Sequence, residues 1–214
     1  MTKILKKIIR NFNDYGFWIT IRKSVEYPFS FIFYKKIYRL YRIDLSHRIV
    51  KNPDSEPFKF IVLDKNNFRD DLIEQIESLE EWIIGVLKKD LKEDGICIIA
   101  LDGDTVAGFN WISFNEVYIP IIMKTKVFRP HTAWSEQITV NKNYRGKGLG
   151  TSLRIHAFIE LKNRNIRKFY GGTLNINEAN IRLSQKAGFE FYVDVHFLRL
   201  FGCKMWKYKR IVQR

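Results

Sequence analysis

The residues best suited to chemistry in this chain form a glycine loop with two cations, Arg145-Gly-Lys-Gly-Leu-Gly150. The loop follows a strand-like run, residues 133–140, and precedes a helix-like run that begins at Thr151. Glycines let a backbone approach a ligand closely because no Cβ stands in the way. The first N–H groups of a helix have no partner within it and can point at an anion. The pattern predicts a phosphate-binding loop, to which Arg145 and Lys147 add full positive charges.

Two well-known phosphate loops do not fit this stretch. A Walker loop closes with Gly-Lys followed by Ser or Thr, which is absent here. A dinucleotide-binding loop has Gly-x-Gly-x-x-Gly and an acidic residue about 20 residues further on. The spacing here is Gly146-Lys-Gly-Leu-Gly150, and the next predicted strand, residues 168–173, carries no acid. A simple strand-to-helix turn is the alternative, but such a turn needs neither the cations nor three glycines.

A second motif lies about thirty residues further on and reads Asn177-Glu-Ala-Asn-Ile-Arg-Leu-Ser-Gln-Lys-Ala-Gly-Phe189. Its apolar spacing predicts a short helix that Gly188 ends as a C-terminal cap, followed by a strand over residues 189–200. Together the two motifs resemble the GCN5-related N-acetyltransferase (GNAT) superfamily, over roughly residues 58 to 200. Arg145, Gly148 and Gly150 match the family's acyl-CoA pyrophosphate loop; Asn177, Lys186, Gly188 and Phe189 match its later Asn…Lys-x-Gly-Phe pattern.

This resemblance implies an α/β (α+β) fold with a central mixed, mostly antiparallel, twisted sheet that is splayed in the middle and flanked by helices. It implies acetyl-CoA, or another acyl-CoA, as co-substrate, with no metal. In this family the strand before the loop pairs through its main chain with the pantetheine arm. The expected cofactor site therefore comprises Ile138, Thr139, Val140, Arg145, Gly146, Lys147, Gly148, Leu149, Gly150, Thr151 and Asn177.

One residue departs from the family pattern. Many members carry a tyrosine seven residues after the motif asparagine, placed to protonate the leaving CoA thiolate, and this chain has Ser184 there. A serine hydroxyl is a far weaker acid than a phenol, whose pKa is about 10, so we do not assign that role to Ser184. The Asn-x-x-Asn-x-Arg form without tyrosine resembles the branch associated with cell-envelope polysaccharide and amino-sugar acylation.

Acyl transfer to an amine requires a base, and two residues are candidates. Glu136 alternates in phase with Ile138 and Val140, so we expect it in an apolar row where its pKa would be raised. The alternatives are a salt-bridged strand carboxylate, or an exposed one if the strand bulges. His131 is the second candidate, because histidine titrates near neutral pH.

Composition limits the remaining possibilities. The 214 residues, 46% of them hydrophobic, suit one domain with its own core. Cys97 and Cys203 make no disulfide framework, and Cys97 sits in an apolar run typical of a buried thiol in a reducing compartment. The four histidines show no metal-ligand spacing. No stretch approaches the ~20 apolar residues of a membrane span, and the start lacks a signal core. We therefore expect a cytoplasmic protein.

The positive charge is concentrated at the two ends of the chain. Residues 1–43 hold ten Lys/Arg and two acids, residues 196–214 hold six and none, and residues 44–195 hold 21 of each sign. Lys35, Lys36, Arg39 and Arg42 read as the basic stripe of an amphipathic helix, with an apolar stripe beside them. We therefore expect a basic, aromatic-rich helical extension at 1–50, an acyltransferase domain at 51–200 and a basic tail at 201–214.

Basic amphipathic ends suit an anionic membrane surface, which would make the protein peripheral on the inner face of the membrane through residues 1–43 and 196–214. The alternative is that these faces pack on the domain or on a second copy in a homodimer. Nucleic acid is disfavoured, because following phosphates needs no aromatic amphipathic helix.

Apolar spacing predicts the other elements. Strands are expected at 58–63, 96–101, 105–114, 133–140 and 168–173, with a hairpin turn at Asp102-Gly-Asp104 and an irregular edge segment at 118–123. Helices are expected over 68–89, in two pieces, from the glycine loop to 162, and over 178–187.

The predicted function is N-acyl transfer from acyl-CoA to a small amine, an amino sugar or a lipid-linked acceptor. Three alternatives remain open: a carrier-protein donor attracted by the basic ends, an aminoacyl-tRNA acceptor, and a non-catalytic module that binds acyl-CoA or anchors a partner at a membrane.

Overall fold

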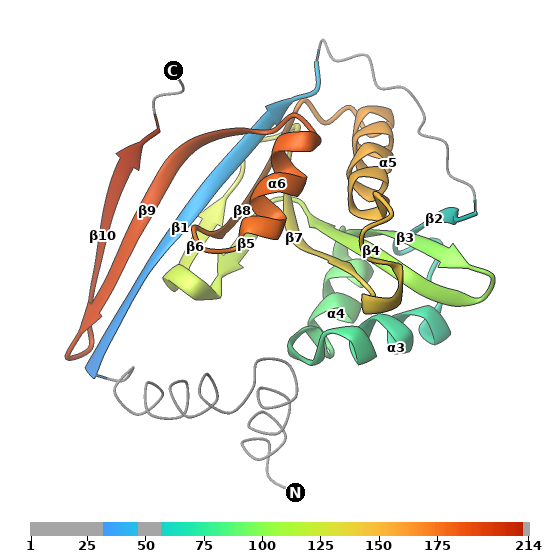
Figure 1. Ribbon diagram of the computed structural model, residues 1–214, viewed down its shortest axis with the longest axis horizontal. Helices are drawn as coiled ribbons and strands as arrows, with labels where there is room; N and C mark the ends of the chain where they lie inside the picture. The colour runs from blue at the N-terminus through green and yellow to red at the C-terminus, as the bar shows by residue number, and fades with distance from the viewer. Residues whose placement is uncertain (1–31, 47–56, 212–214) are drawn as a thin grey trace, which may run out of the picture.

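The computed structural model describes residues 32–46 and 57–211. Its main feature is an eight-stranded sheet in the order β10-β9-β1-β8-β7-β4-β3-β2, with a separate β5–β6 ribbon (Figure 1). The strands are β1 (Phe33–Asp44), β2 (Lys59–Leu63), β3 (Ile96–Asp102), β4 (Thr105–Ser113), β5 (Glu116–Ile119), β6 (Lys124–Val127), β7 (Thr132–Val140), β8 (Lys168–Leu174), β9 (Glu190–Leu200) and β10 (Cys203–Arg210). The helices are α3 (Asp70–Leu79), α4 (Val86–Glu93), α5 (Leu149–Asn163) and α6 (Glu178–Lys186), with 3-10 turns at Glu81–Ile83, Pro120–Ile122 and Lys142–Tyr144.

The predicted fold class is confirmed. All neighbouring strands described in the large sheet are antiparallel except β7 and β8, which run parallel. The hairpin of β3 and β4 turns at Gly103, whose φ of +58° favours glycine. The helix expected over 68–89 is present as two helices, α3 and α4, as predicted. The segment expected to be irregular, 118–123, comprises the end of β5 and a 3-10 turn that begins at Pro120.

Strand β1 overturns the prediction of a helix after Pro28. The tyrosine-rich run at residues 33–44 is a strand inserted between β8 and β9 and paired with both. Its apolar spacing also fits a strand, because Tyr38 and Leu40 pack on one cluster while Tyr41 and Ile43 pack on another. The run forms a strand and not a helix because it pairs with β8 along one edge and with β9 along the other. A domain boundary at residue 50 is therefore wrong for this strand; residues 1–31 lie outside the described part of the chain.

The expected basic stripe of that helix is also broken up. Arg39 forms two hydrogen bonds with Asp194 of β9, at 2.8 and 2.9 Å. Arg42 lies over the ring of Tyr192 and 4.0 Å from the carboxylate of Glu190. These cations join neighbouring strands instead of forming one face for a membrane.

The C-terminal segment is likewise part of the sheet. Residues 203–210 form β10 and pair in full register with β9, so the prediction of a separate tail from residue 201 is wrong for them. Aromatic side chains from this strand complete a cluster with the β5–β6 ribbon, where the Nε1 of Trp206 donates to the carbonyl of Ile122 at 2.8 Å. The prediction missed this because aromatics among lysines fit an edge strand as well as an amphipathic tail.

Alternate residues of β3 separate the two large cores. Ile96, Ile98 and Ala100 pack with α5 and α6, whereas Cys97 and Ile99 pack with α3 and α4 on the opposite face (Figure 1). Cys97 is fully buried, as its sequence context predicts.

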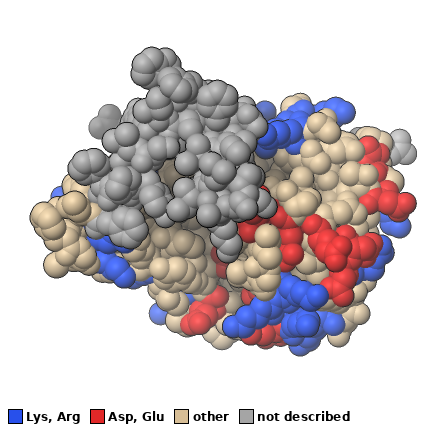
Figure 2. All heavy atoms as spheres, turned by 90° about the horizontal axis from the view of Figure 1, so that it is seen from below, with Lys and Arg blue, Asp and Glu red and all other residues tan. Residues whose placement is uncertain are grey.

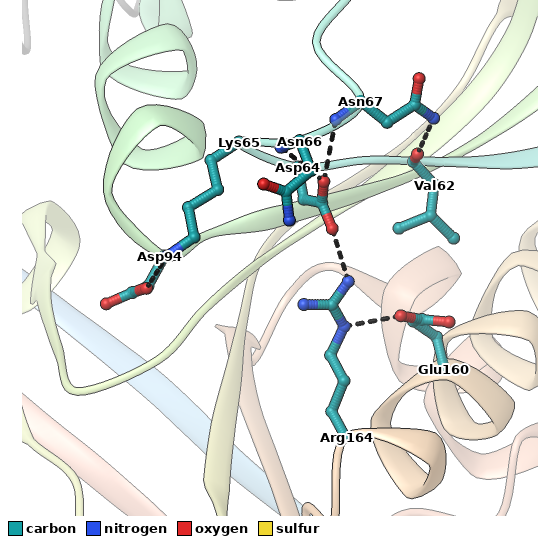
Figure 3. A network of polar contacts seen from close by, with 8 residues as sticks. All are labelled: Val62, Asp64, Lys65, Asn66, Asn67, Asp94, Glu160 and Arg164. Atoms are coloured by element: carbon teal, nitrogen blue, oxygen red, sulfur yellow. Dashed lines mark hydrogen bonds and ion pairs between the residues drawn. The ribbon is translucent and has the colours of Figure 1, made fainter.

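Helix α5 is clamped at its C-terminal end (Figure 3). Arg164 donates from Nη2 to Asp64 at 2.7 Å and from Nε to Glu160 at 2.6 Å. Burial alone would raise the pKa of Asp64, but hydrogen bonds from Arg164 and from the backbone N–H groups of Asn66 and Asn67 lower it. This network fixes α5 to the end of β2, and so fixes the glycine loop at the other end of the helix.

None of the helices within residues 32–46 and 57–211 is long and apolar enough to cross a membrane. The same residues contain no cluster of three or more His, Cys, Asp or Glu side chains that would hold a metal.

Candidate functional site

The sheet opens between β7 and β8. The two strands pair only at their start, where Thr132–Trp134 meets Lys168–Tyr170, and the rest of each strand diverges. Residues 135–140 of β7 therefore have one backbone edge paired with β4 and the other facing the gap. Backbone N–H and C=O groups need partners, so this free edge is suited to an extended amide-bearing ligand.

A cavity of roughly 1090 Å³ occupies this opening. Strand β7 contributes Ile138, Thr139 and Val140, as predicted, and Asn177, the N-cap residue of α6, lines the cavity too. Of the predicted loop residues, Arg145, Gly146, Gly148, Leu149, Gly150 and Thr151 line it. The structure thus brings both sequence motifs to one cavity.

The glycine loop has the open geometry that a phosphate needs. Gly146 and Gly148 have φ values of +82° and +78°, and a Cβ at either would meet no atom within 4 Å. Gly148 is the N-cap of α5, and the residues of the first turn, Leu149, Gly150 and Thr151, line the cavity, so the start of the helix borders the open space. Gly150 serves packing instead, because a Cβ there would lie 3.1 Å from the side chain of Leu183 on α6.

The charged residues around the loop are arranged differently from the expectation. The Nε of Arg145 donates to the carbonyl of Val140 at 3.1 Å, which holds its guanidinium at the cavity. The ammonium of Lys147 lies 5.8 Å from the centre of the Tyr144 ring, and Lys147 does not line the cavity, so its predicted place in the site is not supported. Arg182 and Lys186 of α6 line it instead.

Asn177 has a structural task as well. Its side-chain oxygen accepts a hydrogen bond from the N–H of Asn180 at 3.1 Å and so caps α6. At the other end Gly188, with φ of +83°, donates to Gln185, and Phe189 donates to Ser184, which confirms the predicted glycine cap.

Glu136 lies at a bulge in β7. Its neighbours Gln137 and Ser135 pair with consecutive residues of β4, Trp111 and Ile112, so Glu136 is the extra residue between them. Bulges re-aim side chains and occur beside active sites. The bulge also changes the phase: Glu136 bonds Ser113 on the α4 side, so the expected row with Ile138 and Val140, which pack on the α5 side, is wrong.

The environment of Glu136 favours its protonated form. Burial raises the pKa of its carboxyl, a hydrogen bond with Ser113 opposes the rise and the charge of Asp90 adds to it, so that the pKa is about 8. Glu136 also lines the cavity. A carboxyl group with a pKa of about 8, near neutral pH, therefore faces the gap between β7 and β8.

His131 lies away from the cavity, at the start of β7. It is exposed, its Nδ1 is 2.9 Å from the carbonyl of Asn165, and it does not line the cavity. The prediction that it is a second candidate base is therefore not supported by its position.

Strand β1 brings residues to the cavity that sequence reasoning missed. Tyr38 and Tyr41 both line it, as does Arg154 of α5, which is fully buried and donates from Nη2 to the hydroxyl of Tyr41 at 2.9 Å. Among the described residues, the Nε and Nη1 of Arg154 have no hydrogen-bond partner. A charged residue on the buried face of a predicted helix was the available signal.

The other wall of the cavity carries carboxylate and indole groups. Glu80 accepts a hydrogen bond from Thr139 at 3.0 Å, and Trp82, half exposed, stands beside it on the same wall. Both lie where α3 gives way to α4. Figure 2 shows acidic side chains gathered on that face; residues 70–94 hold nine Asp/Glu against three Lys.

Comparison with known families and structures agrees with this geometry. Residues 56–189 match the model of the acetyltransferase (GNAT) family. No curated protein matches the chain.

Three solved structures share the fold at low sequence identity. A conserved protein of unknown function from Staphylococcus epidermidis ATCC 12228 is 12% identical, with a TM-score of 0.55 over 86% of this chain and 67% of its own. A GCN5-related N-acetyltransferase from Sphaerobacter thermophilus is 13% identical, with a TM-score of 0.56 over 87% and 56%. The glucosamine N-acetyltransferase region of a fungal multi-domain β-N-acetylglucosaminidase is 15% identical, with a TM-score of 0.57 over 82% of this chain and 22% of that one.

Proposed function

Because this chain belongs to the acetyltransferase (GNAT) family, whose members move an acetyl group from acetyl-CoA to an amine, we propose that the cavity between β7 and β8 is where it does so. The single observation that carries the proposal is that both sequence motifs and the bulged Glu136 line this one cavity.

The donor fits the residues present. The open N-cap at Gly148 and the guanidinium of Arg145 would hold its diphosphate, because helix N-termini and arginine both favour phosphate. The edge of β7 that faces the gap, from Ile138 to Val140, would pair with the amide groups of the pantetheine arm; the Val140 carbonyl on it also accepts from Arg145. Bound acetyl-CoA supplies an activated acyl group, and the chain holds and orients it.

Glu136 acts as the base in this proposal. In its ionised form it takes the proton from the acceptor ammonium, directly or through a water, so the neutral amine can attack the thioester carbon. The new amide bond forms as the carbon–sulfur bond breaks, the thiolate leaves with the electron pair, and the nitrogen gives up its second proton, through solvent, to that thiolate. Ser184 does not protonate the leaving thiolate, because it is fully buried and its hydroxyl donates to the side-chain oxygen of Asn180 at 3.2 Å.

The acceptor in this proposal is a small amine on a sugar or a lipid-linked intermediate. Trp82 lines the cavity with half of its surface exposed, and an indole ring suits the apolar face of a sugar. Glu80 and the acidic face over α3 and α4 would attract a cationic amine. The fungal structure with a TM-score of 0.57, described as a glucosamine N-acetyltransferase region, is in keeping with this class.

We place the protein in the cytoplasm, where acetyl-CoA is made, and at a membrane surface through the cations of β10. Lys204, Lys207 and Lys209 are exposed on that edge strand. The alternative reason for them is protection of the sheet edge from pairing with other chains.

The proposal is tested with acetyl-CoA and a panel of amino sugars, with released thiol as the readout. We expect turnover that falls by 10² or more in Glu136→Gln, the usual size of a general-base effect. Calorimetry with CoA is the second measurement, and Glu136→Gln should bind CoA like the wild type. Absence of both CoA binding and turnover would contradict the proposal.

A further inference from the structure

The tip of the β9–β10 hairpin carries large apolar side chains on its surface. Phe201 is 78% exposed, and Ile32, Phe33 and Leu200 are exposed by 46, 52 and 37%. The four residues lie together, because the N–H of Phe201 donates to the carbonyl of Ile32 at 2.9 Å and Phe33 pairs with Leu200. Figure 1 shows the turn between β9 and β10 beside the start of β1, at the far end of a long three-stranded arm. These four residues form the apolar tip.

The turn at the apolar tip holds an unexpected residue. Leu200 pairs with Cys203, so Phe201 and Gly202 make a two-residue turn, and their φ values are +46° and +84°. Positive φ at both positions is the pattern of a type I′ turn, in which Asn-Gly is a preferred pair. A bulky side chain at positive φ is strained, and most of the Phe201 surface is exposed instead of packed in the fold. This residue therefore suits a contact outside the folded chain better than it suits the turn.

Cations border the apolar tip. Lys35 lies on the same face of β1 as Phe33, because alternate residues of a strand share a face. Lys204 is the second residue of β10, and both lysines are exposed. The two stretches that form this arm with its tip, residues 32–43 and 195–210, contain no Asp or Glu. Binding to a membrane surface grows with the apolar area buried and with attraction to anionic lipids, and the tip supplies both.

The shape and charge of the apolar tip select among the possible partners. Small ligands bind in concave pockets, whereas this tip is the end of a projecting hairpin. A second copy of the chain in a symmetric tip-to-tip contact would place its lysines against the same lysines, and like charges repel. An anionic bilayer takes up apolar side chains between its lipids and attracts lysines to its surface.

We propose that the apolar tip inserts into the surface of an anionic bilayer, with Phe201 among the acyl chains and Lys35 and Lys204 at the lipid headgroups. This inference rests on the membrane part of the proposed function and adds an apolar contact to the attraction of the β10 cations. Its consequence is that a polar substitution at the tip weakens membrane binding even though every charge of the protein is kept.

The decisive variant is Phe201→Asn, which keeps every charge and places a preferred residue in the turn. We expect it to bind vesicles of mixed phosphatidylcholine and phosphatidylserine at least about tenfold more weakly than wild type, the effect of withdrawing one phenyl group from an apolar phase. In urea unfolding it should be at least as stable as wild type, because asparagine tolerates positive φ. A role of Phe201 in the fold alone predicts lower stability with unchanged vesicle binding, and that result would overturn the proposal.

The matched control is Val127→Asn, which removes an apolar side chain that is 73% exposed on the β5–β6 ribbon. This variant should bind the vesicles like the wild type. If Val127→Asn and Phe201→Asn weaken vesicle binding equally, the apolar tip has no special part and the proposal fails.

A probe on the exposed thiol of Cys203 measures insertion directly. Cys97 is fully buried, so a thiol-reactive fluorophore labels Cys203, which pairs with Leu200 at the tip. Vesicles whose acyl chains carry bromine should quench this probe in the wild type and quench it much less in vesicle-bound Phe201→Asn. Wild-type protein that binds the vesicles without quenching would be held by charge alone, which would overturn the insertion and leave the membrane proposal in place.

Two further measurements separate this inference from the others. Phe201→Asn should keep wild-type turnover of acetyl-CoA with a soluble amine, because the apolar tip does not line the cavity. A wild-type protein that inserts into vesicles without any turnover would retain the inference and refute the catalytic proposal. Dimerisation that Phe201→Asn abolishes in sedimentation, without vesicle binding by the wild type, would assign the tip to a second copy and overturn the inference.

Discussion

The ring of Tyr41 lies directly on the backbone of Gly171, its partner across the β1–β8 pair. A Cβ on Gly171 would stand 2.4 Å from Cε2 of the tyrosine and 2.7 Å from its hydroxyl. The next glycine, Gly172, makes the same room for Tyr38, with a Cβ at 2.2 Å from that ring. Adjacent glycines on β8 thus admit one tyrosine on each face of the sheet beside the cavity.

Gly171→Ala should therefore destabilise the fold. The new methyl group overlaps a fully buried ring, and overpacking of this kind costs about 1–3 kcal/mol. Urea unfolding measures the loss. In a Tyr41→Ala background the same glycine change should cost much less, and an unchanged cost there would contradict the contact.

The glycine loop is tested by a pair of variants that differ only in charge. Asn and Asp both tolerate the left-handed backbone of Gly148, so Gly148→Asn and Gly148→Asp carry similar strain. Asp would face the donor diphosphate. We expect CoA to bind Gly148→Asp at least about tenfold more weakly than Gly148→Asn, with equal thermal stability, because like charges at close range cost a kcal/mol or more. Equal affinities of the two variants for CoA in calorimetry would contradict the binding of the diphosphate at this loop.

The raised pKa of Glu136 predicts a pH-dependent stability. The ordinary pKa is 4.5 and the folded value is about 8, so between these values the folded protein holds a proton that unfolding releases. Stability should therefore fall as pH rises from about 4.5 through about 8, by up to a few kcal/mol. Glu136→Gln lacks this loss, so its unfolding free energy relative to wild type should grow with pH. If the difference in unfolding free energy between Glu136→Gln and wild type stays constant across this range, the pKa of the Glu136 carboxyl is not raised.

The membrane proposal predicts that β10 carries affinity for anionic lipid. Replacing Lys204, Lys207 and Lys209 with Gln should weaken sedimentation with phosphatidylserine vesicles by about 100-fold, at about 1 kcal/mol per lysine. The matched control replaces three lysines of α4, Lys88, Lys89 and Lys92. If both triple variants lose binding equally, the effect is net charge and β10 has no special part.

The sequence predicted the site well where the chemistry is local. The glycine loop at the start of α5 and the cap at Gly188 depend on neighbours a few residues away, and they appear in the structure where expected. The predicted phase of Glu136 is wrong because β7 has one extra residue at its bulge. The bulge depends on the pairing of β7 with β4, and the periodicity of the β7 sequence alone does not show it.

The ends of the chain were mispredicted for a different reason. Tyr34, Ile37, Tyr38 and Tyr41 lie at spacings that suit a helix, and the same run also suits a strand. What decides is the presence of two open strand edges, on β8 and β9, more than 120 residues away. Arg154 escaped notice for a similar reason, because its partner Tyr41 comes from that distant strand.

The insertion of β1 also governs the order in which the protein can be made. The strand leaves the ribosome more than 120 residues before either of its neighbours, which both lie beyond residue 167. At synthesis rates of about 5–20 residues per second, it waits on the order of ten seconds with both edges bare. Aromatic strands in that condition invite pairing with other nascent chains, and charged side chains suppress it. Lys35, Lys36, Arg39 and Arg42 lie along this strand, so its basic character protects the newborn chain until β8 and β9 have been made.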